Sequence, residues 1–236
     1  MDIKTSSILN AKKAAGFAAV SFITEGMCVG IGTGSTVKFF IEALAKRHEE
    51  GLNITAVATS HASETLAQQL NIPLKSPESV KMIDLTVDGA DEIDSHKNMI
   101  KGGGGALLRE KLAAKSSREM IVIVDETKVK TNLGLFPVAV EIVPYLCLHT
   151  IHELETRGYH GKLRLNNKQK PYLTDNNNYI YDISYSKPIF DPEKEHQNLK
   201  MITGVVETGL FYQLAGRVIV GYEDGTVKIF ENLKSQ

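Results

Sequence analysis

The sequence predicts an α/β protein with a Rossmann-like, mostly parallel sheet flanked by helices and a smaller α+β lobe of the ferredoxin-like kind. Short apolar runs alternate with helical patterns as far as residue 124. After Lys128 this regular alternation of predicted strands and helices ends. Strands that alternate with helices pair in parallel through right-handed crossovers, so the first part is assigned to one open sheet.

The elements of the first part follow from residue spacing. Apolar residues recur at helical intervals up to about Ile23, and Ser6 or Ser7 is expected to cap this first helix. A buried strand is predicted next, then a turn of glycines, and a second helix from Ser35. Strands are predicted at 27–31, 54–58, 82–87 and 120–124, and further helices at 62–70 and 106–115.

The segment after Lys128 mixes strands and helices. Asp224-Gly225 separates two β-rich runs, which predicts a hairpin that returns to the main domain, and Asn176-Asn177-Asn178 predicts a turn. In the lobe, strands are expected at 138–143, 162–165 and 179–185, and helices at about 148–157 and 193–201. The predicted domains are 1–136 plus 209–236 for the main domain and 137–208 for the lobe.

Composition excludes several classes of protein. The chain has 236 residues, 42% of them hydrophobic, with 27 Lys and Arg against 28 Asp and Glu. This balance gives no global field to attract nucleic acid or acidic lipid, so neither partner is expected. Cys28 and Cys147 lack metal-ligand spacing and are expected to be reduced thiols. Because no long apolar run occurs, the expected location is the cytoplasm.

The glycine turn Gly30-Ile-Gly32-Thr-Gly34-Ser-Thr36 lies between a predicted strand and helix. Free backbone N–H groups and the helix dipole favour an anion there, and the hydroxyls of the turn favour phosphate. A tight turn with glycines for packing is the alternative. The pattern is not G-x-G-x-x-G and lacks the Lys of a Walker A loop, which weakens both nucleotide interpretations.

The stretch from Asp88 to Glu110 is dense in charge and glycine. Four carboxylates lie between Asp88 and Asp94, and Lys101 precedes four consecutive glycines. The carboxylates are interpreted in three ways: as turn and cap residues, as ligands for Mg²⁺, or as proton-transfer groups. Each glycine costs backbone entropy, so four in a row indicate close approach of the backbone to a ligand.

Four motifs together resemble one family. GIGTGST at 30–36, TVDGADEID at 86–94, KGGGGALLREK at 101–111 and DETK at 125–128 occur in the order and approximate spacing of the type A ribose-5-phosphate isomerases. The resemblance implies a cofactor-free and metal-free aldose–ketose isomerase of the non-oxidative pentose phosphate pathway. Its substrates would be D-ribose 5-phosphate and D-ribulose 5-phosphate, with a cis-enediol intermediate and a homodimer or homotetramer formed through the lobe.

The resemblance also implies roles for individual residues. Glu110 would be the base that moves a proton between C1 and C2, and Asp88 and Asp91 would bind sugar hydroxyls and assist ring opening. Lys101, with the amides of the following glycines, would stabilise the oxyanion. The other implied substrate-binding residues are Gly102, Gly103 and Gly104 at the oxyanion, Gly89 and Ala90 beside the sugar, and Thr33, Gly34, Ser35, Thr36 and Lys128 at the phosphate, with Lys12 as a further candidate.

Two other classes of function remain open at this point. One is a non-catalytic sugar-phosphate sensor, although no helix-turn-helix extension or basic arm is recognisable in the sequence. The other is a transferase or a deaminating isomerase on a similar fold.

Overall fold

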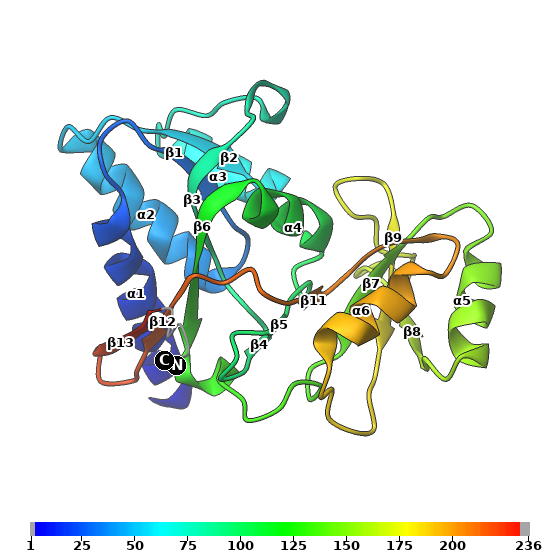
Figure 1. Ribbon diagram of the computed structural model, residues 1–236. Coiled ribbons are helices and arrows are strands. Elements are labelled where there is room, and N and C mark those ends of the chain that lie inside the picture. Colours follow the sequence, from blue (N-terminus) through cyan, green and yellow to red (C-terminus); the bar gives the residue numbers. More distant parts are fainter. Residues whose placement is uncertain (1–2, 232–236) are drawn as a thin grey trace. The chain divides into compact units, whose positions relative to one another are not determined.

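The computed structural model describes residues 3–231, which divide into two compact units (Figure 1). Unit 1 comprises residues 3–90, 109–129 and 214–231, and unit 2 comprises 91–108 and 130–213. Residues 91–108, 130–136 and 209–213 group with unit 2 by their contacts, whereas the sequence assigned them to the main domain.

Unit 1 is built on a six-stranded sheet with the order β13-β12-β6-β3-β1-β2. All neighbours pair in parallel except β12 and β13, which form the antiparallel hairpin predicted around Asp224-Gly225. The Rossmann-like prediction is therefore confirmed. The strands are β1 (Cys28–Ile31), β2 (Thr55–Ala58), β3 (Ile83–Asp88), β6 (Ser117–Asp125), β12 (Arg217–Gly221) and β13 (Val227–Phe230).

Helices α1 (Ile3–Ala19) and α2 (Ser35–Glu49) lie side by side, and α1 also packs on β6 and β12 (Figure 1). A Cβ on Gly16 would lie 2.8 Å from the Phe40 nitrogen, so glycine permits the close approach of α1 and α2. The apolar side chains between helices and sheet form a core that includes Phe40. Helix α3 (His61–Gln69) follows β2, and a 3₁₀ turn (Val20–Phe22) follows α1.

One expected cap is wrong. Ser6 and Ser7 lie inside α1, because the helix already begins at Ile3. No Gly or Pro occurs between Ile3 and Ser7 to stop the helix, and serine costs only a few tenths of a kcal/mol in a helix interior, roughly 0.5.

Unit 2 contains a four-stranded antiparallel sheet with the order β10-β7-β9-β8. Along the chain its elements follow the pattern βαββαβ, which with this strand order is the ferredoxin-like arrangement predicted for the lobe. The elements are β7 (Val138–Ile142), α5 (Cys147–Thr156), β8 (Gly161–Leu163), β9 (Tyr179–Ile183), α6 (Pro192–Lys200) and β10 (Val205–Thr208).

The predicted asparagine turn is also present. Asn177 has a φ of 60°, in the left-handed region that asparagine tolerates better than most residues. The Thr174 hydroxyl accepts hydrogen bonds from the amides of Asn176 and Asn178, which closes the turn ahead of β9.

A second sheet of unit 2 was not predicted. It has the order β11-β5-β4, with β4 (Glu92–Ile93), β5 (Met99–Ile100) and β11 (Leu210–Phe211). Its strands have two residues each, too short for an alternating pattern to be recognised. Strand β4 contains part of the acidic stretch, and strand β5 ends directly before Lys101.

Candidate active site

Asp88 ends β3 and is completely buried. Its Oδ1 accepts hydrogen bonds from the backbone amides of Thr33 at 3.0 Å and Gly89 at 2.7 Å. Because β1 and β3 are parallel neighbours, the glycine turn after β1 and Asp88 lie at the same edge of the sheet. The structure therefore brings Asp88 together with the predicted phosphate-binding turn.

Gly32 is required by this contact. A Cβ on Gly32 would lie 2.1 Å from Asp88 Oδ1 and 2.2 Å from its Cγ, much closer than any real contact. Helix α2 begins at Ser35 without a side-chain cap, so the first N–H groups of the helix have no partner from a capping side chain. Such a helix N-terminus favours an anion.

Gly32→Ala tests this packing. We expect the unfolding free energy to fall by about 1–3 kcal/mol, since the methyl group must displace the buried Asp88 carboxylate. Turnover is expected to fall as well. Chemical denaturation and a turnover assay on the same preparation measure both effects, and a variant with wild-type stability and activity would contradict the packing described.

Hydroxyl groups surround the turn. Thr33 Oγ1 is 2.9 Å from Thr59 Oγ1 and 2.8 Å from Ser60 Oγ, and Ser63 donates to the Gly32 carbonyl at 2.6 Å. Ser60 also caps α3 by accepting from the Ser63 amide. This network fixes the Thr33 side chain, so its hydroxyl is oriented by the protein.

Two lysines lie near the same edge of the sheet. Lys12 donates from α1 to the Ser35 hydroxyl at 3.0 Å, directly at the start of α2. Lys128 ends a 3₁₀ turn after β6, which Asp125 stabilises by accepting from the Thr127 amide at 3.1 Å. Because β6 is the parallel neighbour of β3, Lys128 follows a strand end adjacent to that of Asp88.

The other acidic residues of the stretch, Asp91, Glu92 and Asp94, have different hydrogen-bond partners. Asp91 Oδ2 accepts from the Gly103 amide at 2.8 Å, which ties it to the glycine loop. Glu92 is buried and accepts from the amides of Gly134 and Phe136, so it holds another loop of unit 2. Asp94 accepts from the amides of His96 and Asn98 and closes the turn between β4 and β5. The turn interpretation thus describes Asp94.

Lys101 is a buried cation in unit 2, with 3% of its surface exposed. Its backbone amide donates to the Gly209 carbonyl, and its Nζ lies 5.6 Å from the centre of the Phe211 ring. A Cβ on Gly209 would lie 2.2 Å from the Lys101 carbonyl oxygen, so only glycine allows this approach. The backbone of Lys101 is thus fixed against Gly209, and its ammonium group lies near the aromatic face of Phe211.

Glu110 is buried, with 4% exposed, in the first turn of α4 (Leu107–Lys115). The positive end of the helix dipole stabilises a carboxylate at this position. Burial acts in the opposite sense, because desolvation disfavours charge. Glu110 is therefore a buried carboxylate at the start of a helix.

Two side chains distant in sequence, Arg164 and Tyr172, contact the carbonyl groups of the four-glycine loop. Arg164 donates from Nη1 to the carbonyls of Gly102 at 2.9 Å and Gly103 at 3.2 Å. The Tyr172 hydroxyl lies 3.4 Å from the Gly104 carbonyl oxygen. Sequence reasoning missed both side chains, because neither lies in a recognisable motif and about 60 residues separate them from the loop.

The predicted site residues thus fall into two groups. Each group belongs to one unit. Unit 1 contains Thr33, Gly34, Ser35, Thr36, Asp88, Gly89, Ala90, Glu110 and Lys128, and unit 2 contains Asp91, Lys101, Gly102, Gly103 and Gly104.

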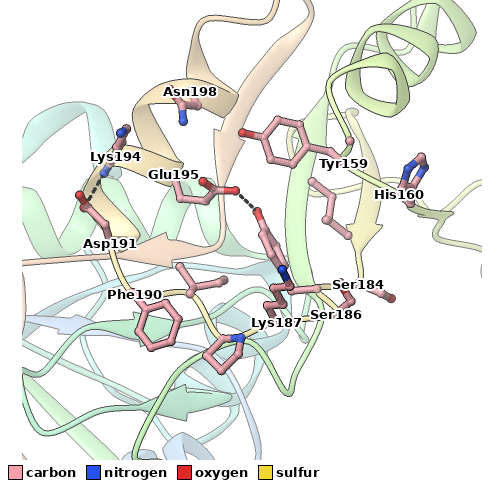
Figure 2. A pocket seen from close by; sticks show the side chains of 15 residues that line it. Tyr159, His160, Ser184, Ser186, Lys187, Phe190, Asp191, Lys194, Glu195 and Asn198 are labelled. Atoms are coloured by element: carbon pink, nitrogen blue, oxygen red, sulfur yellow. Dashed lines mark hydrogen bonds between the residues drawn. The ribbon is translucent and has the colours of Figure 1, made fainter.

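A hollow of about 590 Å³ lies elsewhere in unit 2 (Figure 2). Within this hollow the Tyr185 hydroxyl donates a hydrogen bond to Glu195 Oε1 at 2.9 Å. Burial and the nearby Glu195 raise the pKa of Tyr185, so this phenol stays protonated. The lining residues run from Gly158 to Asn198 and include none of the predicted site residues.

The described part of the chain lacks two features. Between residues 3 and 231, no group of three or more His, Cys, Asp or Glu side chains is arranged to hold a metal ion. No helix in that range is both long and apolar enough to cross a membrane.

The fold and the predicted site define an α/β protein of Rossmann-like type. Its predicted site combines polar residues at the ends of parallel strands with a loop of four glycines. The family model of ribose 5-phosphate isomerase A (phosphoriboisomerase A) matches residues 55–225. The chain belongs to the ribose 5-phosphate isomerase A family.

Individual relatives agree over nearly the whole chain. The ribose-5-phosphate isomerase A of Protochlamydia amoebophila is 54% identical over 224 residues, which cover 95% of this chain and 97% of that protein. The solved ribose 5-phosphate isomerase of Plasmodium falciparum has a TM-score of 0.90 and 38% identity, covering 94% of this chain and 98% of that one. A D-ribose-5-phosphate isomerase in complex with phospho-erythronic acid also has a TM-score of 0.90, with 38% identity and coverage of 98% and 100%.

Proposed function

We propose that the chain interconverts D-ribose 5-phosphate and D-ribulose 5-phosphate, the reaction for which its family is named. The observation that carries the proposal is the set of buried ionisable groups, Asp88, Lys101 and Glu110, within motifs that resemble those of the family. Burial of charged groups costs free energy, and ionisable groups buried together within the motifs of one family are candidates for catalysis.

Glu110 is assigned the role of the base. Moving a proton between C2 of the aldose and C1 of the ketose requires a carboxylate that can both remove and return it. Glu110 is a buried carboxylate in the first turn of α4, within the motif KGGGGALLREK that resembles the family's. In the proposed reaction this carboxylate removes the proton from one carbon and returns it to the other, with a cis-enediol as the intermediate.

Lys101 is assigned to the negative charge that develops on the substrate oxygen. A preoriented cation in a site that excludes water stabilises an oxyanion strongly. Lys101 is 3% exposed and its backbone is fixed by the Gly209 carbonyl, so little reorganisation is needed. The amides of Gly102, Gly103 and Gly104 are assigned to the same oxyanion. In the structure, the Gly103 amide donates to Asp91.

Asp88 and Asp91 are assigned to the sugar hydroxyls, with Gly89 and Ala90 between them. Both carboxylates accept backbone N–H bonds that fix their orientation, at 3.0 Å from Thr33 to Asp88 and 2.8 Å from Gly103 to Asp91. A fixed carboxylate can accept a hydroxyl proton during ring opening without moving.

The phosphate is assigned to the turn after β1. The assigned groups are the start of α2, the hydroxyls of Thr33, Ser35 and Thr36, and the lysines Lys12 and Lys128. The turn follows β1 and Lys128 follows β6, the two strands that flank β3, and Lys12 on α1 donates to the Ser35 hydroxyl. The phospho-erythronic acid bound by one relative carries a phosphate and a carboxylate, and these anions match the phosphate and the enediolate of the proposed reaction.

One experiment separates the rival functions. The purified protein is incubated with ribose 5-phosphate alone, and ribulose 5-phosphate is measured with and without EDTA. We expect rapid formation of the ketose at the same rate in both samples. Binding without conversion would favour a sensor, a requirement for a second substrate would favour a transferase or deaminating isomerase, and inhibition by EDTA would favour the Mg²⁺ interpretation.

Assembly and location are further parts of the proposal. We propose a homodimer or homotetramer formed through the lobe and a cytoplasmic location, with no nucleic-acid or membrane partner. Both cysteines are free thiols, which supports a reducing compartment. Light scattering coupled to size-exclusion chromatography tests the assembly, and a monomeric mass at micromolar concentration would contradict it.

A further inference from the structure

Two peptides of the four-glycine loop, Gly102–Gly103 and Gly103–Gly104, turn their carbonyl groups toward Arg164, and the Gly105 amide closes the turn on the Gly102 carbonyl at 3.0 Å. Arg164 binds the carbonyls of Gly102 and Gly103 through the same nitrogen, Nη1. In a trans peptide the N–H points opposite to the C=O, so the amides of Gly103 and Gly104 point away from Arg164. The Gly103 amide points toward Asp91 and donates a hydrogen bond to it.

Arg164 is itself held rigidly. Its Nε and Nη2 donate to the two carboxylate oxygens of Asp182 on β9, at 2.8 and 2.5 Å. The side chains are only 17% and 24% exposed. This is the bidentate geometry in which a guanidinium pairs most strongly with a carboxylate, and lysine cannot reproduce it.

The aromatic ring of Tyr172 completes the support. The guanidinium carbon of Arg164 lies 5.8 Å from the ring centre, and the hydroxyl reaches toward the Gly104 carbonyl. A Cβ on Gly105 would lie 2.4 Å from the Tyr172 oxygen, so the loop can pack on this ring only with glycine there. Three consecutive carbonyls of the loop are thus engaged by two side chains of the lobe.

We propose that Arg164, braced by Asp182, is a positioning residue for catalysis: it orients the Gly102–Gly103 and Gly103–Gly104 peptides, and with them Asp91 and the loop amides, toward the reacting sugar. The inference rests on the proposed isomerase function. Four hydrogen bonds use most of the five donors of the guanidinium, so Arg164 acts through the loop and does not bind the substrate.

The position of the loop controls the rate more than the affinity. The proposed phosphate ligands belong to a different part of the chain, so substrate binding persists when the loop moves. A misplacement of reacting groups by about 1 Å can cost about 100-fold in rate. Loss of the guanidinium is therefore expected to lower kcat and leave KM nearly unchanged.

The test compares Arg164→Ala and Arg164→Lys with the wild type and with Arg157→Ala. Arg157 is a matched control in the same unit, half exposed and paired with Glu153 at 3.7 Å. We expect both Arg164 variants to lose about 10- to 100-fold in kcat, with KM within about threefold of wild type. Arg157→Ala is expected to retain wild-type kinetics.

Chemical rescue separates positioning from a role in folding. Added methylguanidinium should restore part of the kcat of Arg164→Ala in a saturable manner, whereas methylammonium, which lacks the planar fork, should not. If Arg164→Ala does not fold, Arg164→Lys carries the kinetic comparison, because its aliphatic chain and charge remain.

Two outcomes overturn the inference. One is a kcat of both folded variants within about twofold of wild type, and the other is a rise in KM at unchanged kcat. Both leave the isomerase function standing, since the wild type converts ribose 5-phosphate in the same assay. Failure of the wild type itself to convert ribose 5-phosphate overturns the function instead.

Discussion

Glu110→Gln is expected to lower kcat by about 10²- to 10⁴-fold, because the amide cannot accept the carbon-bound proton. Glutamine has nearly the same shape as glutamate, and Glu110 lies in a regular turn of α4, so the fold is expected to persist. Substrate affinity should change little, since the proposed phosphate ligands are untouched. Steady-state kinetics and calorimetric titration with ribose 5-phosphate measure the two quantities separately.

A matched control is Glu49→Gln. Glu49 is an exposed glutamate at the end of α2, and its replacement removes the same charge without an effect on turnover. If Glu110→Gln retained wild-type activity while the control behaved as expected, another group would have to be the base.

The second large effect is expected for Lys101→Met. Methionine fills a similar volume beside Phe211 but has no charge, so the developing oxyanion loses its cation. Removal of one such stabilising group costs about 10²- to 10³-fold in kcat. Because the stabilised charge exists mainly in the transition state, KM should change far less, and initial rates over a range of substrate concentrations show the difference.

Lys162→Met is the control for this variant. Lys162 is an exposed lysine of β8, in the same unit as Lys101, and its loss should leave kcat within about twofold of wild type. An equal loss of activity in both variants would point to a general effect of charge on the unit, and unchanged activity in Lys101→Met would remove Lys101 from the proposed mechanism.

The elements of the fold that could be predicted from sequence are those with long periodic patterns. The strand–glycine–helix order around Ser35 predicted β1 and α2, and α2 begins at that residue. Asp224-Gly225 predicted the β12–β13 hairpin because Gly225 supplies the positive φ of its turn, 84°. The two-residue strands β4 and β5 carry no period and were missed.

The candidate site was predictable as a set of residues but not as a set of contacts. Neighbouring carboxylates of one motif proved to have different partners: Asp91 binds the glycine loop, whereas Glu92 binds amides more than 40 residues away. Arg164 and Asp182 could not be found from sequence, because only the antiparallel lobe brings them to the loop. Such long-range pairings depend on topology, which local patterns do not encode.

The most direct test of the central claim, that Glu110 moves the carbon-bound proton, is isomerisation in D₂O followed by NMR. A base that exchanges its proton with solvent during the lifetime of the enediol leads to deuterium at C1 of ribulose 5-phosphate and, at equilibrium, at C2 of ribose 5-phosphate. We predict this incorporation for the wild type and its loss in Glu110→Gln that still binds substrate. Incorporation by Glu110→Gln at the wild-type rate would contradict the account.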